Sequence, residues 1–389
     1  MSMISSLLSL SGAGTGYAGG KCVDEMPHLS MTEACAEFPV AICEMQREFA
    51  FMDRNHNDAM VEAVVNSAMY GTDIDTDALM ESAFDTLKTK VTAFFEKILK
   101  FIRSIKAKIQ MYIDKATMSG KQLVARYKEQ VNKKDLDGLT MTGYEFTADS
   151  FENEVKKASS SEDIIKLVST AVGKDVKNPI GLNYGSYKAG EEPEDIKKDI
   201  EVINDASADT RVGNIVKELT GGKVDTKSDI KGELKKYLYG GTDKKEMKYG
   251  STYGNGGFVF TREKTVSYLE NPVDLTKIRE SYDALQRAAE DQKKTFTTSL
   301  EKMQKDKDNA SDENAQRGMQ AAITYFNAFL KVLSDCYTAI NLVRDAKVRV
   351  AQEKEKQYRN AFSKMMTYKK SKDNSDFEID AFDEFDFEI

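Results

Sequence analysis

Hydrophobic and polar residues alternate with a helical period between Phe84 and Ile113. The pattern predicts a long helix with one apolar and one basic face, which we call the basic helix. N-cap and acidic residues before it predict a start near Thr76 and an end at about Met118 or somewhat beyond, with Gly120 as a candidate end or bend. Its apolar positions are Phe84, Leu87, Val91, Phe94, Phe95, Ile98, Phe101, Ile102, Ile105, Ile109 and Tyr112, and its basic positions are Lys88, Lys90, Lys97, Lys100, Arg103, Lys106 and Lys108.

Two further helical patterns follow Pro272 and are separated by a polar break at Asp306–Glu313. The first carries Leu275, Ile278, Tyr282, Leu285, Ala289, Phe296, Leu300 and Met303, and the second carries Met319, Ile323, Phe326, Leu330, Leu333, Tyr337, Ile340, Val343, Val350, Tyr358, Phe362 and Met365. They predict a long helical hairpin over residues 272–371. The second helix, from about Asn314 to Tyr368, outruns the first, so its far end requires another surface. The N-terminal helices or another subunit can supply that surface.

Residues 135–271 have a mixed pattern that predicts a small α+β domain. Strand-like pieces lie at Leu139–Phe146 and Gly257–Phe260, and short helical patterns lie at Ser161–Val172, Glu194–Ile203, Val212–Leu219 and Lys227–Tyr239.

The two ends of the chain differ from these regions in composition. Residues 1–24 are rich in serine and glycine and are expected to form a flexible segment. Residues 25–134 form an N-terminal helical region, in which two helices precede the basic helix. Residues 372–389 form an acidic aromatic tail. The fold class predicted from these patterns is mainly α, with long helices, a C-terminal hairpin and a small α+β centre.

Charge is distributed unevenly along the chain. Thirteen Lys or Arg residues between Lys88 and Lys134 face only three acids, Glu96, Asp114 and Glu129, which gives this segment a charge of +10. Because the whole chain carries −8, the remainder carries −18. This division favours an anionic partner for the basic helix, or pairing between the two parts.

The terminal sequence DFEIDAFDEFDFEI, residues 376–389, contains seven acidic groups and no basic ones. Its composition fits a disordered, solubilising end. The period-two spacing of its apolar side chains equally fits a peptide that binds a partner, for example by adding a strand to a sheet. The candidate contact residues are Phe377, Ile379, Phe382, Phe385, Phe387 and Ile389.

Three roles fit the basic helix: a core helix with a solvated basic face, reversible contact with an anionic membrane, or contact with a phosphate backbone. The candidate binding residues are Lys88, Lys90, Phe94, Phe95, Lys97, Ile98, Lys100, Phe101, Arg103, Lys106 and Lys108.

Motifs for chemistry lack the context that they require. Gly14, Gly16 and Gly19 match a dinucleotide fingerprint, but no buried strand precedes them and no helix pattern follows. Two segments that begin like calcium loops, at Asp53 and Asp73, lack the required glycine and glutamate. We therefore expect no enzyme, no cofactor and no small-molecule substrate.

Phe258 and Phe260 resemble the aromatic strand of an RNA-recognition domain only faintly, and side chains in this pattern ordinarily face a core. The gaps between Cys22, Cys35 and Cys43 match no familiar zinc spacing, and His28 and His56 lie in no recognisable triad. The four cysteines are expected to be buried or idle thiols, and no metal site is predicted.

No apolar run approaches the roughly 20 residues needed to cross a bilayer. The first residues lack the positive region of a secretory signal. We expect the chain to be made in a cytosol, either remaining there or joining a particle assembled there.

Three parts of the chain carry a resemblance to a known class of protein. They are the block at residues 68–109, AMYGTDIDTDALMESAFDTLKTKVTAFFEKILKFIRSIKAKI, the block at residues 215–241, IVKELTGGKVDTKSDIKGELKKYLYGG, and the long C-terminal helices. In this organisation the chain resembles virion structural proteins of large tailed bacteriophages. The resemblance implies a non-enzymatic component of a virion that contacts other virion proteins or copies of itself. The alternative is a membrane-active or DNA-associated internal protein that is ejected into the host.

Overall fold

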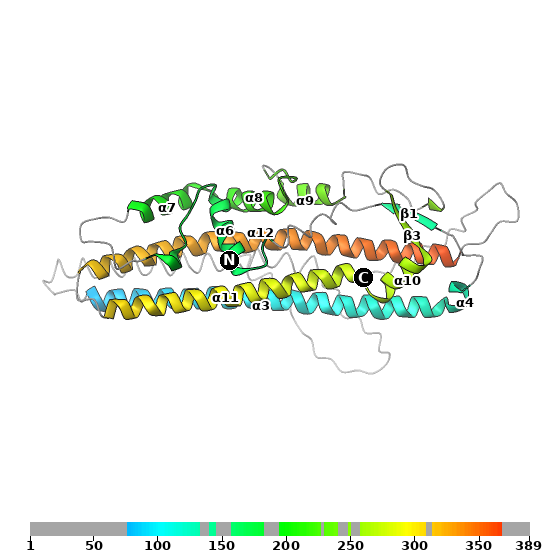
Figure 1. The fold of residues 1–389 in the computed structure, drawn as a ribbon, viewed down its shortest axis with the longest axis horizontal. Helices are drawn as coiled ribbons and strands as arrows, with labels where there is room; N and C mark the ends of the chain where they lie inside the picture. Colours follow the sequence, from blue (N-terminus) through cyan, green and yellow to red (C-terminus); the bar gives the residue numbers. More distant parts are fainter. Residues whose placement is uncertain are drawn as a thin grey trace, which may run out of the picture.

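The computed structural model describes residues 76–132, 140–144, 157–182, 194–226, 229–239, 248–249, 257–308 and 313–367. This part of the chain is mainly α, as predicted, and has one small sheet. Figure 1 shows an elongated molecule in which long helices lie lengthwise, short helices cover one side, and the sheet occupies one end.

Three long helices form the body of the molecule. They are α3 (Thr76–Arg126), α11 (Val273–Asp308) and α12 (Glu313–Met366). Figure 1 shows that α11 runs opposite to both α3 and α12. The apolar stripe of α11 meets both neighbours, because the ring of Phe296 lies 5.5 Å from that of Phe95 on α3 and 5.9 Å from that of Phe326 on α12.

Short helices from the middle of the chain pack along α12. They are α6 (Ser161–Val172), α7 (Glu194–Asp205), α8 (Ala208–Leu219) and α9 (Ile230–Tyr239), with the 3-10 turn η4 (Pro179–Gly181). Local signals set several boundaries: the Ser160 and Ser207 hydroxyls cap α6 and α8, and Gly173, at φ 72°, ends α6 in a left-handed conformation. These helices share one core with α3, α11 and α12.

The sheet and a short helix form the far end of the molecule. Strand β1 (Thr140–Tyr144) lies between β2 (Lys248–Tyr249) and β3 (Gly257–Thr261), and both pairings are antiparallel. The next helix is α10 (Arg262–Glu270), and α4 (Lys128–Val131) follows α3. Here Phe260, Leu269 and Phe362 belong to a second buried cluster. The sheet, α10 and α3 thus supply the surface that the excess length of α12 requires.

Gly120 does not end α3, because the helix continues to Arg126. The backbone of α10 crosses α3 so closely at this point that a Cβ on Gly120 would lie 2.0 Å from the Leu269 carbonyl oxygen. Only glycine leaves room for that crossing, so this glycine serves packing and not the end of the helix.

Buried polar contacts connect α12 to its neighbours. The Arg211 Nε of α8 donates to Asp335 Oδ2 at 2.6 Å, and the Tyr337 hydroxyl donates to Gln292 Oε1 of α11 at 2.8 Å. Arg211, Asp335, Gln292 and Tyr337 are all buried. These contacts fix α12 laterally, since each leaves an unsatisfied group if the helices shift.

Cys336 is a buried free thiol, and burial raises its pKa well above the ordinary value. Cys22, Cys35, Cys43, both histidines, the two expected helices before α3 and the acidic tail lie outside the described residues.

Candidate partner-binding surface on the basic helix

The apolar half of the basic helix is part of the core. Phe94, Phe95, Ile98, Ile102 and Ile105 are at most 3% exposed. The rings of Phe94 and Phe95 pack edge to face at 5.0 Å. In this fold these side chains face α11 and α12, and lipid insertion through them would require the helices to separate.

One edge of the basic helix is bound to α11 by a series of polar contacts. Each step forward along α3 is matched by a step back along α11, as antiparallel helices require. The pairs are Lys88 with Glu301 at 3.4 Å, Glu96 with Lys293 at 3.1 Å, Arg103 with Glu290 at 3.3 Å, Lys106 with Asp283, and Gln110 Oε1 with Arg279 Nη1 at 2.7 Å. We call this set the α3–α11 ladder. Three of the basic residues for which an anionic partner was expected, Lys88, Arg103 and Lys106, therefore pair with acids of the same chain.

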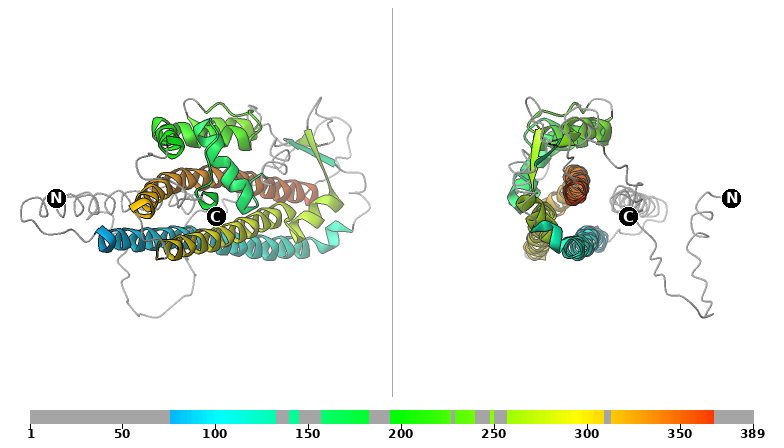
Figure 2. Two further views of the ribbon diagram at one scale, coloured as in Figure 1. Left: turned by 60° about the vertical axis from the view of Figure 1, so that its left-hand side comes forward. Right: turned by 90° about the vertical axis from the view of Figure 1, so that its right-hand side faces the viewer.

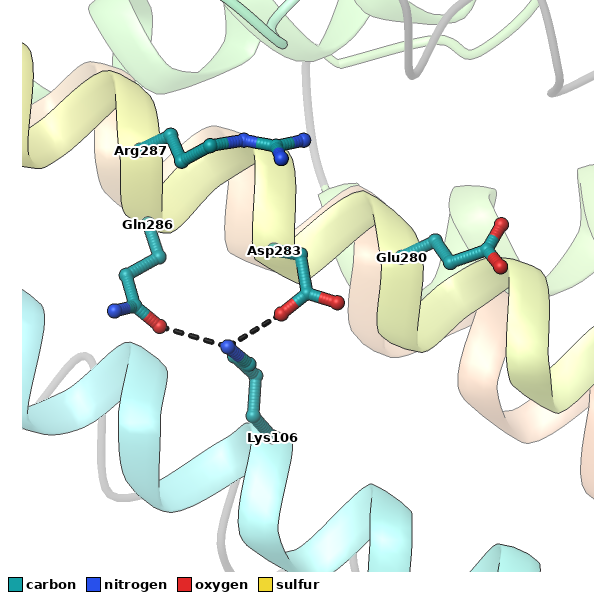
Figure 3. Close-up of a pocket in the computed structure, with 5 residues that line it drawn as sticks. All are labelled: Lys106, Glu280, Asp283, Gln286 and Arg287. Carbon is teal, nitrogen blue, oxygen red and sulfur yellow. Dashed lines mark hydrogen bonds and ion pairs between the residues drawn. The ribbon is translucent and has the colours of Figure 1, made fainter.

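A shallow depression on this edge has a volume of about 380 Å³ and is lined by Lys106, Glu280, Asp283, Gln286 and Arg287. Figure 3 shows the Lys106 ammonium directed at both Asp283 and Gln286, and its Nζ donates to Gln286 Oε1 at 2.8 Å. The lining contains two basic and two acidic side chains, and among them Lys106 pairs with Asp283. The depression is thus part of the ladder, with its central cation already paired.

In the ladder, the neighbours of Glu290 shift the pKa of its carboxyl group. It accepts a hydrogen bond from Gln286 Nε2 at 2.8 Å and pairs with Arg103. These contacts, with Gln286 first in importance, lower the pKa of the Glu290 carboxyl below its ordinary value. The carboxylate is therefore charged wherever the protein is near neutral pH.

The side of α3 that faces away from the core carries a different surface. We call it the α3 outer face and define it by Lys100, Lys108, Met111, Lys115, Met118 and Arg126. Met111 is 61% exposed and Met118 is 59% exposed, although most large apolar side chains of this helix are buried. Lys100, Lys115 and Arg126 are exposed, and Lys108 is half-buried. These four cations form no ion pair with another residue in the described part of the chain.

The predicted binding residues of the basic helix thus fall into different environments. Lys90, Phe94, Phe95 and Ile98 are buried; Lys88, Phe101, Lys106 and Lys108 are half-buried; Lys97, Lys100 and Arg103 are exposed. The six predicted contact residues of the tail, Phe377, Ile379, Phe382, Phe385, Phe387 and Ile389, lie outside the described residues. Sequence reasoning missed Met111 and Met118, whose signal is their seven-residue spacing on the polar face.

Within the described ranges, no helix contains a stretch apolar enough to span a bilayer. The same ranges contain no group of three or more His, Cys, Asp or Glu side chains arranged to hold a metal ion.

Comparisons with models of protein families, with curated proteins and with solved structures find no match to this chain.

Proposed function

We propose that the protein is a non-enzymatic structural component of a tailed-phage virion. It makes subunit or capsid contacts through its long helices and its acidic C-terminal segment, and it is assembled in the host cytoplasm. Its partners are other virion proteins or copies of itself.

The observation that carries this proposal is the α3 outer face. An elongated body of packed helices presents two exposed methionines along one long helix, among cations that form no ion pair with a described residue. Methionine is common at protein-binding surfaces because its flexible thioether adapts to different partners. Exposed apolar side chains among cations suit an acidic protein surface that also brings apolar groups. The resemblance to virion proteins supports the same direction.

Mass spectrometry of purified phage particles that encode this chain tests the proposal. We expect the protein in every preparation, at a constant ratio to the major capsid protein after density-gradient purification. Its complete absence from infectious particles would exclude a structural role. An unrelated soluble protein added to the lysate before purification is the control for carry-over, and it should not be found in the purified particles.

The second candidate is an internal protein that contacts a membrane or DNA after ejection. It is favoured by the same cations, because lysines on one helix face attract anionic lipid or a phosphate backbone. In the folded chain such contact would be electrostatic, since Phe94, Phe95 and Ile98 are in the core. Flotation with anionic vesicles at low salt would detect it, and release of the protein by salt would separate surface contact from insertion.

We also propose that α11 and α12 act as a helical hairpin over residues 272–371, and that residues 135–271 form a small α+β domain. The antiparallel packing of α11 and α12 supports the hairpin, and the short helices and small sheet among the described residues support the α+β domain. Limited proteolysis tests these assignments, and we expect early fragments that end near residues 134 and 271. Cleavage within α6 or α8 that occurs earlier than cleavage near these two residues would contradict them.

A further inference from the structure

The α3 outer face is complementary in charge and polarity to an acidic partner with apolar side chains. Its cations Lys100, Lys108, Lys115 and Arg126 form no ion pair with a described residue, and Asp114, on the same side, accepts a hydrogen bond from Gln110 at 2.8 Å. A second copy of this face would place lysine against lysine, so like charges oppose pairing of two α3 outer faces.

The chain contains one segment of matching chemistry at its own end. Residues 376–389 combine seven acidic groups with four phenylalanines and two isoleucines. The acids complement the lysines, and phenylalanine rings make favourable contacts with methionine sulfur.

The C-terminal end of α12 lies beside the C-terminal end of α3. Figure 1 shows the C-terminal ends of α3 and α12 at the same end of the molecule, and the rings of Tyr127 and Phe362 lie 6.0 Å apart. Residues 368–375 span up to about 27 Å when extended. Met111 lies about 24 Å from Tyr127 along the helix axis, by the helical rise of 1.5 Å per residue. Lys100 lies about 40 Å from Tyr127 by the same rise. The 14 residues of the acidic segment add about 46 Å to the reach of the tether when extended, so the segment can extend along the whole face from its own α12.

We propose that residues 376–389 bind the α3 outer face of their own molecule. The acids pair with Lys100, Lys108 and Lys115, and the aromatic side chains cover Met111 and Met118. A short tether gives the segment an effective concentration of about millimolar at this face, so weak individual contacts suffice for occupancy. The inference goes beyond the proposed function because it concerns the isolated chain, in which the segment covers the face. A virion partner that binds either surface would have to displace this contact.

Oxidation of methionine by dilute hydrogen peroxide tests the proposal. The full chain is compared with a chain that ends at residue 375, and mass spectrometry follows sulfoxide formation at Met111 and Met118. We expect removal of the segment to accelerate oxidation of both several-fold at low salt. Met365, which is 1% exposed, is the internal reference and should be slow in both proteins. In about 1 M salt, where the Debye length is about 3 Å, the difference should become small.

Charge reversal separates this surface from general electrostatics. The triple variant Lys100→Glu, Lys108→Glu and Lys115→Glu of the full chain should oxidise as fast as the shortened chain. A matched variant, Lys174→Glu, Lys217→Glu and Lys331→Glu, changes the charge equally at exposed lysines on other elements and should keep the protection.

Equal oxidation rates in the full and shortened chains at low salt would overturn the proposal. So would loss of protection in the matched variant, because it would show that net charge and not this face is responsible. Protection that weakens on dilution by about a hundredfold would also overturn it, since a tethered contact is independent of protein concentration. None of these results depends on whether purified particles contain the chain.

Discussion

The buried ion pair between α8 and α12 and the exposed α3–α11 ladder use the same chemistry in opposite environments. Arg211 and Asp335 have side chains that are 1% and 5% exposed, whereas those of Arg103 and Glu290 are 60% and 43% exposed. Water and salt screen the ladder, and each of its pairs contributes little. The buried pair tolerates no loss of one partner, because the other charge stays in the core. Substitutions at the buried charges should therefore change the free energy of unfolding most, although most charged side chains lie on the surface.

The largest effect is expected for Asp335→Ala. Removal of the carboxylate leaves the Arg211 guanidinium buried, with hydrogen bonds to the Ile203 and Ala206 carbonyls but no counter-charge. We expect the free energy of unfolding to fall by about 3–5 kcal/mol. Urea unfolding followed by circular dichroism measures it.

The double variant Arg211→Met, Asp335→Leu is the control for that loss. It removes both charges and keeps apolar volume, and pairs replaced in this way are often neutral or more stable. A double variant as unstable as Asp335→Ala would show that packing, and not the unpaired charge, causes the loss.

A buried contact without charge should have an intermediate effect. Tyr337→Phe leaves Gln292 Oε1 without its donor, while Gln292 Nε2 still donates to the Ser161 carbonyl. The expected loss is about 1–3 kcal/mol in the same urea measurement. Tyr112→Phe is the matched control, since the Tyr112 hydroxyl has no hydrogen bond to a described residue. If Tyr112→Phe lowered the free energy of unfolding equally, loss of the Tyr337–Gln292 hydrogen bond would not be the cause.

Lys293→Glu should have a smaller effect, because it changes one step of the ladder. It places two carboxylates together at Glu96 and should cost about 0.2–1 kcal/mol at low salt, and less at high salt. The exchanged pair Glu96→Lys, Lys293→Glu restores opposite charges and should recover most of the loss. A loss that persists in the exchanged pair would mean that the lysine stem packs against α3 and that its charge is secondary.

Of these substitutions, Glu290→Gln should change the free energy of unfolding least, and its effect should depend on pH. Because its contacts lower the folded pKa of Glu290, ionised Glu290 stabilises the fold above the unfolded pKa of about 4.3, and this contribution is lost as the pH falls through the lower folded pKa. The difference in unfolding free energy between parent and variant should thus be largest near neutral pH and shrink in acid. A difference that grows on acidification would contradict the sign of the shift.

The helices could be predicted because their apolar periods are long and regular. Leu275, Tyr282, Leu285 and Phe296 on α11 follow the predicted stripe and are all buried. The boundaries of α6 match the predicted Ser161–Val172 because a serine cap and a glycine mark them locally. Periodicity and caps are properties of neighbouring residues, so a single sequence contains them.

The partner of each charge could not be predicted in this way. The pairing of Lys106 with Asp283 depends on the antiparallel register of two helices that are far apart in sequence. Gly120 was a candidate helix end because glycine favours such ends, and the crossing backbone at Leu269 has no local signal. Met111 and Met118 were not singled out because an apolar residue is expected inside, and their exposure depends on where α11 and α12 pack.

In the α3–α11 ladder the pair Glu96–Lys293 has the opposite order of charges from the other ion pairs, and this has a consequence for how the two long helices align. A displacement of α11 by seven residues would replace Lys293, the partner of Glu96, by Gln286 in one direction or by Leu300 in the other. The first of these displacements would also place Lys294 opposite Lys88. Pairs too weak to matter for stability can still exclude misaligned arrangements, because each wrong step removes an attraction or adds a repulsion. During folding, the ladder would thus shorten the lifetime of misaligned helix pairs.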